Sequence, residues 1–244
     1  MQTTRRLISG ELVRIDVPDA VGLPDATSLG VLALEGLGQL EVTGGGDRSL
    51  AVYLELTGTI LDRELTLGDG RVLRYGRFGG DPTQGFGWGL EAGPGSRQHV
   101  YGFTYPFMEL ELLTSYLADV QVQADDHGPW LELSGRVGWS VHRTETIAQV
   151  VELEGTLGAD ASGGLGYLID ARRARAAGHG FDTERPGGGV RVRGGLLSRS
   201  AAQERHRYVV LESDDFVSYG MPGGDGAVEV VASSMADVLV ELGR

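Results

Sequence analysis

Residues 109–122 read ELELLTSYLADVQV, and residues 227–240 read AVEVVASSMADVLV, a second version of the same phrase 118 positions later. In the first stretch apolar or small side chains alternate with polar ones, as at Leu110, Leu112 and Val120. Side chains of a β-strand point alternately to its two faces, so this period of two predicts one long strand with a buried and a solvated face. The second stretch repeats the arrangement and predicts a second such strand.

The repetition suggests an internal duplication of the chain. Six of the fourteen aligned positions are identical, and Tyr101-Gly102 aligns with Tyr219-Gly220 at the same offset. Two β-rich halves, 1–124 and 125–244, are then expected to meet near the turn DDHGP at 125–129. The alternatives are that two amphipathic strands resemble each other without a duplication, and that the two halves form one compact unit.

Composition also favours a β-rich fold. Forty of the 244 residues are glycine, well above the usual share of about 7%, and they cluster between apolar runs as turn residues do. The only stretch where a helix competes with a strand is around 169–177. Further strands are expected in eight stretches: 30–42, 50–60, 71–78, 130–143, 147–157, 165–171, 190–197 and 206–212. The predicted fold is all-β, an antiparallel barrel or sandwich with little helix.

Gly128-Pro129-Trp130 matches the G-x-W pattern that lipocalins carry near a first strand. In outline the chain resembles lipocalin-type barrels, including enzymes built from two such units. This resemblance implies lipocalin-like tandem barrels, and small β-barrels either fill their interior with side chains or hold one small ligand. No site residue of that family is carried over to this chain.

Charge and residue usage exclude several classes of protein. A net charge of −13 argues against binding nucleic acid or an anionic membrane surface, because both require a basic face. No run approaches the roughly 18 apolar residues of a membrane-spanning helix, and the first residues lack the apolar core of a secretory signal, so a cytoplasmic protein is expected. Without cysteine there is no disulfide or thiolate zinc site. The five histidines show no metal-binding spacing, so no metal or cofactor is expected.

Positions that both halves share, such as Asp119 and Asp237, are expected to serve the fold, so functional residues are sought where the halves differ. Eight of the 17 aromatic residues fall between 75 and 107. A strand through HVYGFTYPF at 99–107 would place its one histidine and its aromatic residues on one face. Such a face could line an apolar ligand pocket, or it could be the larger core of the first half.

The predicted ligand pocket has catalytic and binding members. A histidine beside phenols can transfer protons near neutral pH, which makes His99, Tyr101 and Tyr105 the candidate catalytic residues. The candidate ligand-binding residues are the aromatic side chains nearby and the end of a second apolar strand, namely Tyr75, Phe86, Trp88, Phe103, Trp139 and Arg143.

A basic island lies in the acidic second half. Arg172, Arg173 and Arg175 are candidate anion-binding residues, because guanidinium groups recognise carboxylates and phosphates bidentately. The alternative is a solvated loop.

Three functions follow from these patterns. The first is binding of a mostly apolar small molecule, with or without cofactor-independent isomerisation, cyclisation or hydration. The second is a structural protein that forms homo- or hetero-oligomers. The third is a carbohydrate-binding β-protein, which would need Trp88 or Trp139 exposed beside carboxylates.

Overall fold

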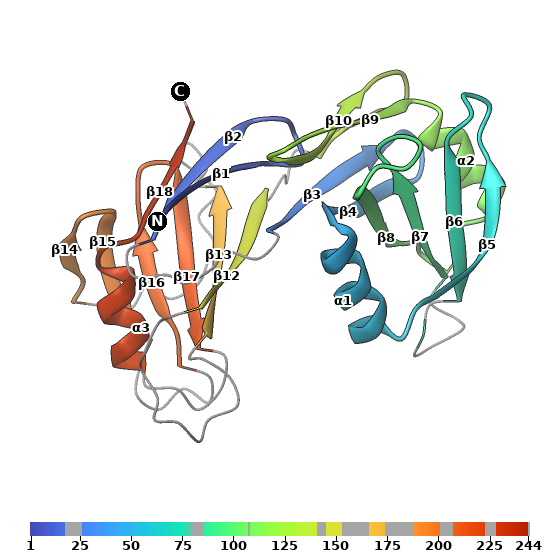
Figure 1. Cartoon of the computed structure of the whole chain (residues 1–244). Helices are drawn as coiled ribbons and strands as arrows, with labels where there is room; N and C mark the ends of the chain where they lie inside the picture. The colour runs from blue at the N-terminus through green and yellow to red at the C-terminus, as the bar shows by residue number, and fades with distance from the viewer. Residues whose placement is uncertain are drawn as a thin grey trace. The chain divides into compact units, whose positions relative to one another are not determined.

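The computed structural model describes residues 1–17, 26–77, 79, 85–106, 108–140, 145–152, 166–173, 188–200, 207–222 and 228–243. Within them the chain is mostly antiparallel β-sheet with three short helices (Figure 1). It divides into two compact units: unit 1 comprises Met1–Arg5, Leu12–Ala26 and Thr146–Arg244, and unit 2 comprises Arg6–Glu11 and Thr27–Glu145. The predicted β-rich class is confirmed, and the finer expectation of a barrel or sandwich stays a prediction.

The described part of unit 2 contains an antiparallel sheet with the strand order β3-β4-β8-β7-β6-β5. Its strands are β3 (Thr27–Leu34), β4 (Gly38–Gly46), β5 (Ile60–Thr66), β6 (Val72–Arg77), β7 (Phe86–Glu91) and β8 (Gln98–Phe103). Helix α1 (Asp47–Thr57) follows β4, and helix α2 (Leu110–Leu117) follows β8. The chain then forms the hairpin of β9 (Val120–Asp125) and β10 (Gly128–Leu133), and β11 (Val137–Trp139) pairs with β3.

Unit 1 has a sheet with the order β12-β13-β17-β16-β15-β14 among its described residues. Its strands are β12 (Thr146–Glu152), β13 (Gly166–Arg173), β14 (Val190–Val192), β15 (Gly195–Arg199), β16 (Val209–Glu212) and β17 (Phe216–Pro222). Helix α3 (Val228–Met235) and strand β18 (Leu239–Leu242) follow. A second sheet has the order β1-β2-β18, with β1 (Gln2–Arg6) and β2 (Leu12–Asp16).

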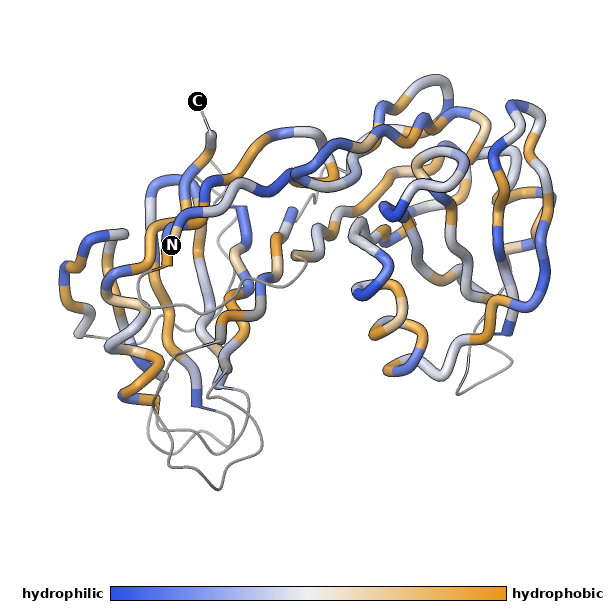
Figure 2. The backbone as a smooth tube through the Cα atoms, viewed as in Figure 1, coloured by the Kyte–Doolittle hydropathy of each residue, from blue (hydrophilic) through white to orange (hydrophobic). Residues whose placement is uncertain are grey.

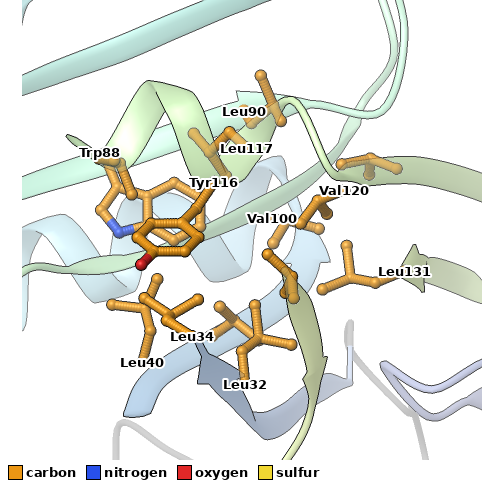
Figure 3. Packing of buried hydrophobic residues seen from close by; sticks show 14 of the residues in the cluster. Leu32, Leu34, Leu40, Trp88, Leu90, Val100, Tyr116, Leu117, Val120 and Leu131 are labelled. Atoms are coloured by element: carbon orange, nitrogen blue, oxygen red, sulfur yellow. The ribbon is translucent and has the colours of Figure 1, made fainter. Parts of the chain in front are cut away.

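The core of unit 2 lies between one face of the sheet, α2 and the β9–β10 hairpin. Helix α2 contributes Leu113, Tyr116 and Leu117, which are at most 6% exposed and belong to one cluster with Trp88 and Val100 of the sheet. Figure 3 shows Tyr116 and Leu117 of this cluster beside leucines of β3 and β4. Burial of one such side chain contributes roughly 1.5–3 kcal/mol, so this cluster stabilises the whole unit.

The strand predicted at 109–122 is wrong. The stretch forms α2 and then β9, and the second copy of the phrase forms α3 and then β18. The buried residues Leu113, Tyr116 and Leu117 are three and four positions apart, which is the spacing of one helix face. A period of two also fits this sequence, because Leu110, Leu112 and Tyr116 share one parity.

Two other expectations also need correction. The strand predicted at 50–60 is α1, which ends where Gly58 takes a left-handed conformation (φ 61) and its N–H bonds the carbonyl of Glu55. The helix expected around 169–177 is strand β13 as far as Arg173, and residues 174–177 lie outside the described residues. Helix formers in SLAVYLEL and the terminal glycine favour α1 as a helix, which the strand prediction overlooked.

On the face of the sheet opposite α2, glycine lets another segment lie directly on the strands. A Cβ added at Gly76 of β6 would lie 1.9 Å from the carbonyl oxygen of Ile60, and one at Gly87 of β7 would lie 2.4 Å from Cγ2 of Thr59. Segment 58–60, which leads from α1 into β5, therefore packs against bare backbone. No residue larger than glycine fits these two positions without moving that segment.

We expect Gly76→Ala to destabilise the protein by roughly 1–3 kcal/mol, because the new methyl group forces segment 58–60 off the sheet. Gly138→Ala in β11 is the matched control, since a Cβ there meets nothing within 4 Å, and its effect should stay within about 0.5 kcal/mol. Urea unfolding of both variants measures the difference. Equal stabilities would contradict the close packing.

Candidate functional site

Helix α1 lies on the face of the sheet opposite the core cluster. Val100 of β8 belongs to that cluster, so its neighbours His99 and Tyr101 point the other way. Both meet α1: His99 contacts Asp47 at the start of the helix, and Tyr101 contacts Tyr53 one and a half turns later. The helix therefore runs along β8 in the same direction as the strand.

The beginning of α1 is held by charge. Nε2 of His99 lies 2.7 Å from Oδ1 of Asp47, and Nε of Arg97 donates to Oδ2 at 3.0 Å. These partners, His99 first and then Arg97, hold the pKa of Asp47 below its usual value. A carboxylate in the first turn also interacts favourably with the helix dipole. Gly46 supplies no side-chain cap, so Asp47 and His99 fix this end of the helix to the sheet.

The middle of α1 is held by two phenol rings. The rings of Tyr53 and Tyr101 lie 4.9 Å apart at 49°, and Tyr101 is 1% exposed. Burial, followed by the negative charge of Glu41, raises the pKa of Tyr53 to about 12. Burial, followed by Tyr53, also raises the pKa of Tyr101. Both shifts lead away from neutral pH, whereas proton transfer requires a pKa near the working pH.

The other side of α1 faces solvent and is largely apolar. Arg48, Ala51, Val52, Glu55 and Leu56 are all exposed and are spaced three or four residues apart, so they share one side of the helix. We call these five residues the α1 face. Val52 is 47% exposed and Leu56 is 82% exposed. Figure 2 shows α1 mostly orange after its first turn.

The three predicted catalytic residues do not form one group. His99 and Tyr101 lie together beneath α1, where they anchor the helix. Tyr105 follows the end of β8 and is 37% exposed. The sequence pattern placed His99 and Tyr101 on one face correctly, but it extended the strand beyond Phe103, where β8 ends.

The predicted ligand-binding residues are divided between the two faces of the sheet. Tyr75 pairs with Trp88 across β6 and β7 on the core side, and Trp88 is 1% exposed. Phe86 packs its edge against Tyr75 with ring centres 6.1 Å apart.

Phe103 shares its parity with Tyr101 on the α1 side and is 36% exposed. Trp139 of β11 packs partly buried against the core cluster, and Arg143 lies outside the described residues.

In unit 1, the predicted anion-binding residue Arg172 is engaged within the unit. Its Nη2 donates to Oδ2 of Asp170 at 2.9 Å, and its guanidinium lies 4.9 Å from the ring centre of Tyr219. Arg173 ends β13, and Arg175 lies outside the described residues. An internal carboxylate already meets Arg172, so the pattern of three arginines does not appear as one open anion site in the part that is described.

Two open grooves in unit 1 are lined mainly by charged and backbone groups. They have volumes of about 600 Å³ and 580 Å³ and share Asp215 and Glu241. Arg14 in the first groove pairs with Glu241 at 3.1 Å, and Arg193 in the second pairs with Asp16 at 2.6 Å. Neither groove is lined by aromatic side chains.

Two further features are absent from the described residues. They contain no cluster of three or more metal-ligating side chains. None of their helices has the length and apolar character needed to cross a bilayer.

The sequence pattern does not indicate the residues of the α1 face, because it predicts a strand at 50–60. The signal that could have found them is the helical spacing of Arg48, Val52 and Leu56 before the terminal Gly58. Comparison with protein families, curated proteins and solved structures found no match to this chain.

The pairing of Asp47 predicts a pH effect. Since the folded-state pKa of Asp47 is lowered, its carboxylate contributes stability above its unfolded pKa of about 3.9, and that contribution is lost as the pH falls through the folded pKa. Asp47→Asn should therefore lower stability most at about pH 6, and its effect should shrink progressively as the pH falls below about 3.9. The midpoints of urea unfolding of both proteins, determined across this pH range, measure the difference in stability.

Asp126→Asn is the control, because Asp126 is exposed and forms no ion pair with another described residue. Its curve should run parallel to that of the unchanged protein. Parallel curves for Asp47→Asn as well would show that the contact with His99 contributes nothing.

Proposed function

We propose that this chain is an assembly protein that binds another protein through the α1 face. The observation that supports the proposal is the exposure of Val52 and Leu56 side by side on a helix that is otherwise fixed to the sheet. A rigid helix with an apolar outer side is a common element of protein recognition. Burying a leucine side chain is worth roughly 1.5–3 kcal/mol, so Leu56, the most exposed large apolar side chain of the α1 face, is expected to contribute strongly to the contact.

The same geometry gives less support to the two ligand hypotheses. An apolar pocket would need the aromatic residues on one side of the sheet, whereas Trp88 and Tyr101 lie on opposite sides. A carbohydrate site would need an exposed tryptophan, whereas Trp88 is 1% exposed and Trp139 packs against the core cluster.

The partner that fits the α1 face is a second copy of the chain. Arg48 lies one turn before Val52, and Glu55 lies one turn after it, so the two charges flank the apolar centre. If two α1 helices pack antiparallel about a twofold axis near Val52, Arg48 of each copy meets Glu55 of the other. Neither side chain has an ion pair with a described residue of its own chain, so both are available.

The contact is expected to be reversible. Helix α1 has 11 residues and is about 16 Å long, which places the interface at the small end of the size range. The negative charge of both copies opposes association at long range. Dimer formation should therefore depend on protein concentration.

We expect Leu56→Glu to weaken self-association at least tenfold, because in each copy it replaces the most exposed large apolar side chain of the α1 face by a carboxylate that loses its hydration in the contact. Native mass spectrometry and sedimentation over a concentration series measure the effect, and thermal unfolding checks that the fold is intact. The control is Leu65→Glu in β5, where the leucine is 38% exposed outside the α1 face. Unchanged dimers in Leu56→Glu would overturn the proposal, and an excess mass of a few hundred daltons lost on denaturation would favour a bound ligand.

Charge reversal tests the antiparallel arrangement. Arg48→Glu alone and Glu55→Arg alone should each weaken the dimer severalfold, because each places like charges together. An equimolar mixture of these two variants should form heterodimers in preference to either homodimer, since the charges are then complementary. Equal amounts of all pairs in the mixture would show that another surface or another partner is involved.

A further inference from the structure

The described strands of the two units follow the same plan. Each unit has a sheet with a row of six described strands, which can be numbered one to six in the order in which they occur in the chain. Across each sheet, neighbouring strands then follow the order first, second, sixth, fifth, fourth and third. In each unit an eight-residue helix follows the sixth strand, α2 in unit 2 and α3 in unit 1. One strand follows directly after each helix, β9 after α2 and β18 after α3, and we call these two the last strands. The phrase repeated at 109–122 and 227–240 falls on these helices and strands.

The last strands also pair in the same way. β9 pairs antiparallel with β10, which follows it in a tight hairpin. β18 pairs antiparallel with β2, although Arg14 and Glu241 in this pair are 227 positions apart in the chain. β10 precedes the sheet strands of unit 1 in the sequence, and β2 precedes those of unit 2. Each last strand therefore pairs with the strand that leads into the other sheet.

The two pairings have equivalent registers. Val122 lies opposite Leu131, and at the offset of 118 its counterpart Val240 lies opposite Ile15. All four side chains are at most 7% exposed. The hydrogen bond from Gly243 N to Leu12 O at 2.8 Å continues the β2–β18 ladder beyond the paired strands.

We propose that the chain consists of two copies of one repeat, from β2 to β9 and from β10 to β18, which exchange their leading strands. β9 and β10 are joined by the chain itself, whereas β2 and β18 are joined only by their pairing, which we call the closing contact. Because each leading strand serves the other repeat, a β2 strand from a second chain fits β18 equally well. A second chain can therefore supply the β2 strand of the closing contact, and this association does not involve the α1 face.

The burial of apolar side chains explains why β2 and β18 stay paired with a strand. Val13, Ile15 and Val17 are 0% exposed, and Val240 of β18 is 2% exposed. Detaching β2 would expose these side chains and the backbone groups of both strands, so an opened chain gains by pairing with an opened second chain. Exchange of this kind is favoured by high concentration during refolding.

Because the full chain contains no cysteine, introduced cysteines can report by disulfide formation which strands pair. One protein carries Arg14→Cys with Glu241→Cys, at positions that lie opposite each other in β2 and β18. Two further proteins carry one of these changes each. All carry Leu56→Glu as well, so that the α1 face does not bring chains together. The matched control mixes Arg14→Cys with Glu132→Cys, because β2 and β10 are both leading strands and do not pair.

At low concentration the double variant should oxidise within one chain, and its unfolding temperature should rise. When the two single variants are unfolded together and refolded at high concentration, oxidation should link chains through positions 14 and 241, at least fivefold above the control mixture. When the two single variants are mixed without unfolding, the yield of disulfide-linked chains should not exceed that of the control mixture. A double variant that does not cross-link would overturn the closing contact between β2 and β18, and refolded single variants that link no more than the control would overturn exchange with a second chain.

Discussion

The close approach of segment 58–60 to the glycines of β6 and β7 determines how one face of unit 2 is built. With no side chain at Gly76 and Gly87, the segment lies on the strand backbone and directs the chain from α1 into β5. The end of α1 is thereby held against the sheet, while Asp47 and Tyr53 hold its beginning and middle. A helix fixed at three points exposes the same residues to solvent at all times, which is why Val52 and Leu56 stand outward.

The polar and aromatic residues under α1 are better understood as anchors than as reactive groups. Burial raises the pKa values of the phenols of Tyr53 and Tyr101 further from neutral pH, and the carboxylate of Asp47 already bonds to His99 and Arg97. Groups that already bond to one another within the fold are poorly placed to bind a substrate or react with it. The chemistry of this face therefore favours positioning of a surface over catalysis.

The sequence predicted the β-rich class well, because glycine-rich turns separate apolar runs and mark strand ends. It failed at α2 and α3, where buried residues such as Leu113 and Leu117 fit a helix and their neighbours also fit a strand. It predicted that His99 and Tyr101 share a face, since parity within one strand can be read directly. It could not relate Trp88 to Tyr101, because the pairing of β7 with β8 places Trp88 opposite Gly102 on the other face, and this register depends on long-range hydrogen bonds.

The pairing of β2 with β18 also has a consequence for synthesis. Translation proceeds at about 5–20 residues per second, so β18 leaves the ribosome roughly 11–45 s after β2. Unit 2 can form in the meantime, because its described strands lie between Thr27 and Trp139. β2 can pair with β1 during this interval, but the edge that receives β18 stays open and its buried apolar side chains lack that cover, so the early part of the chain needs protection from association.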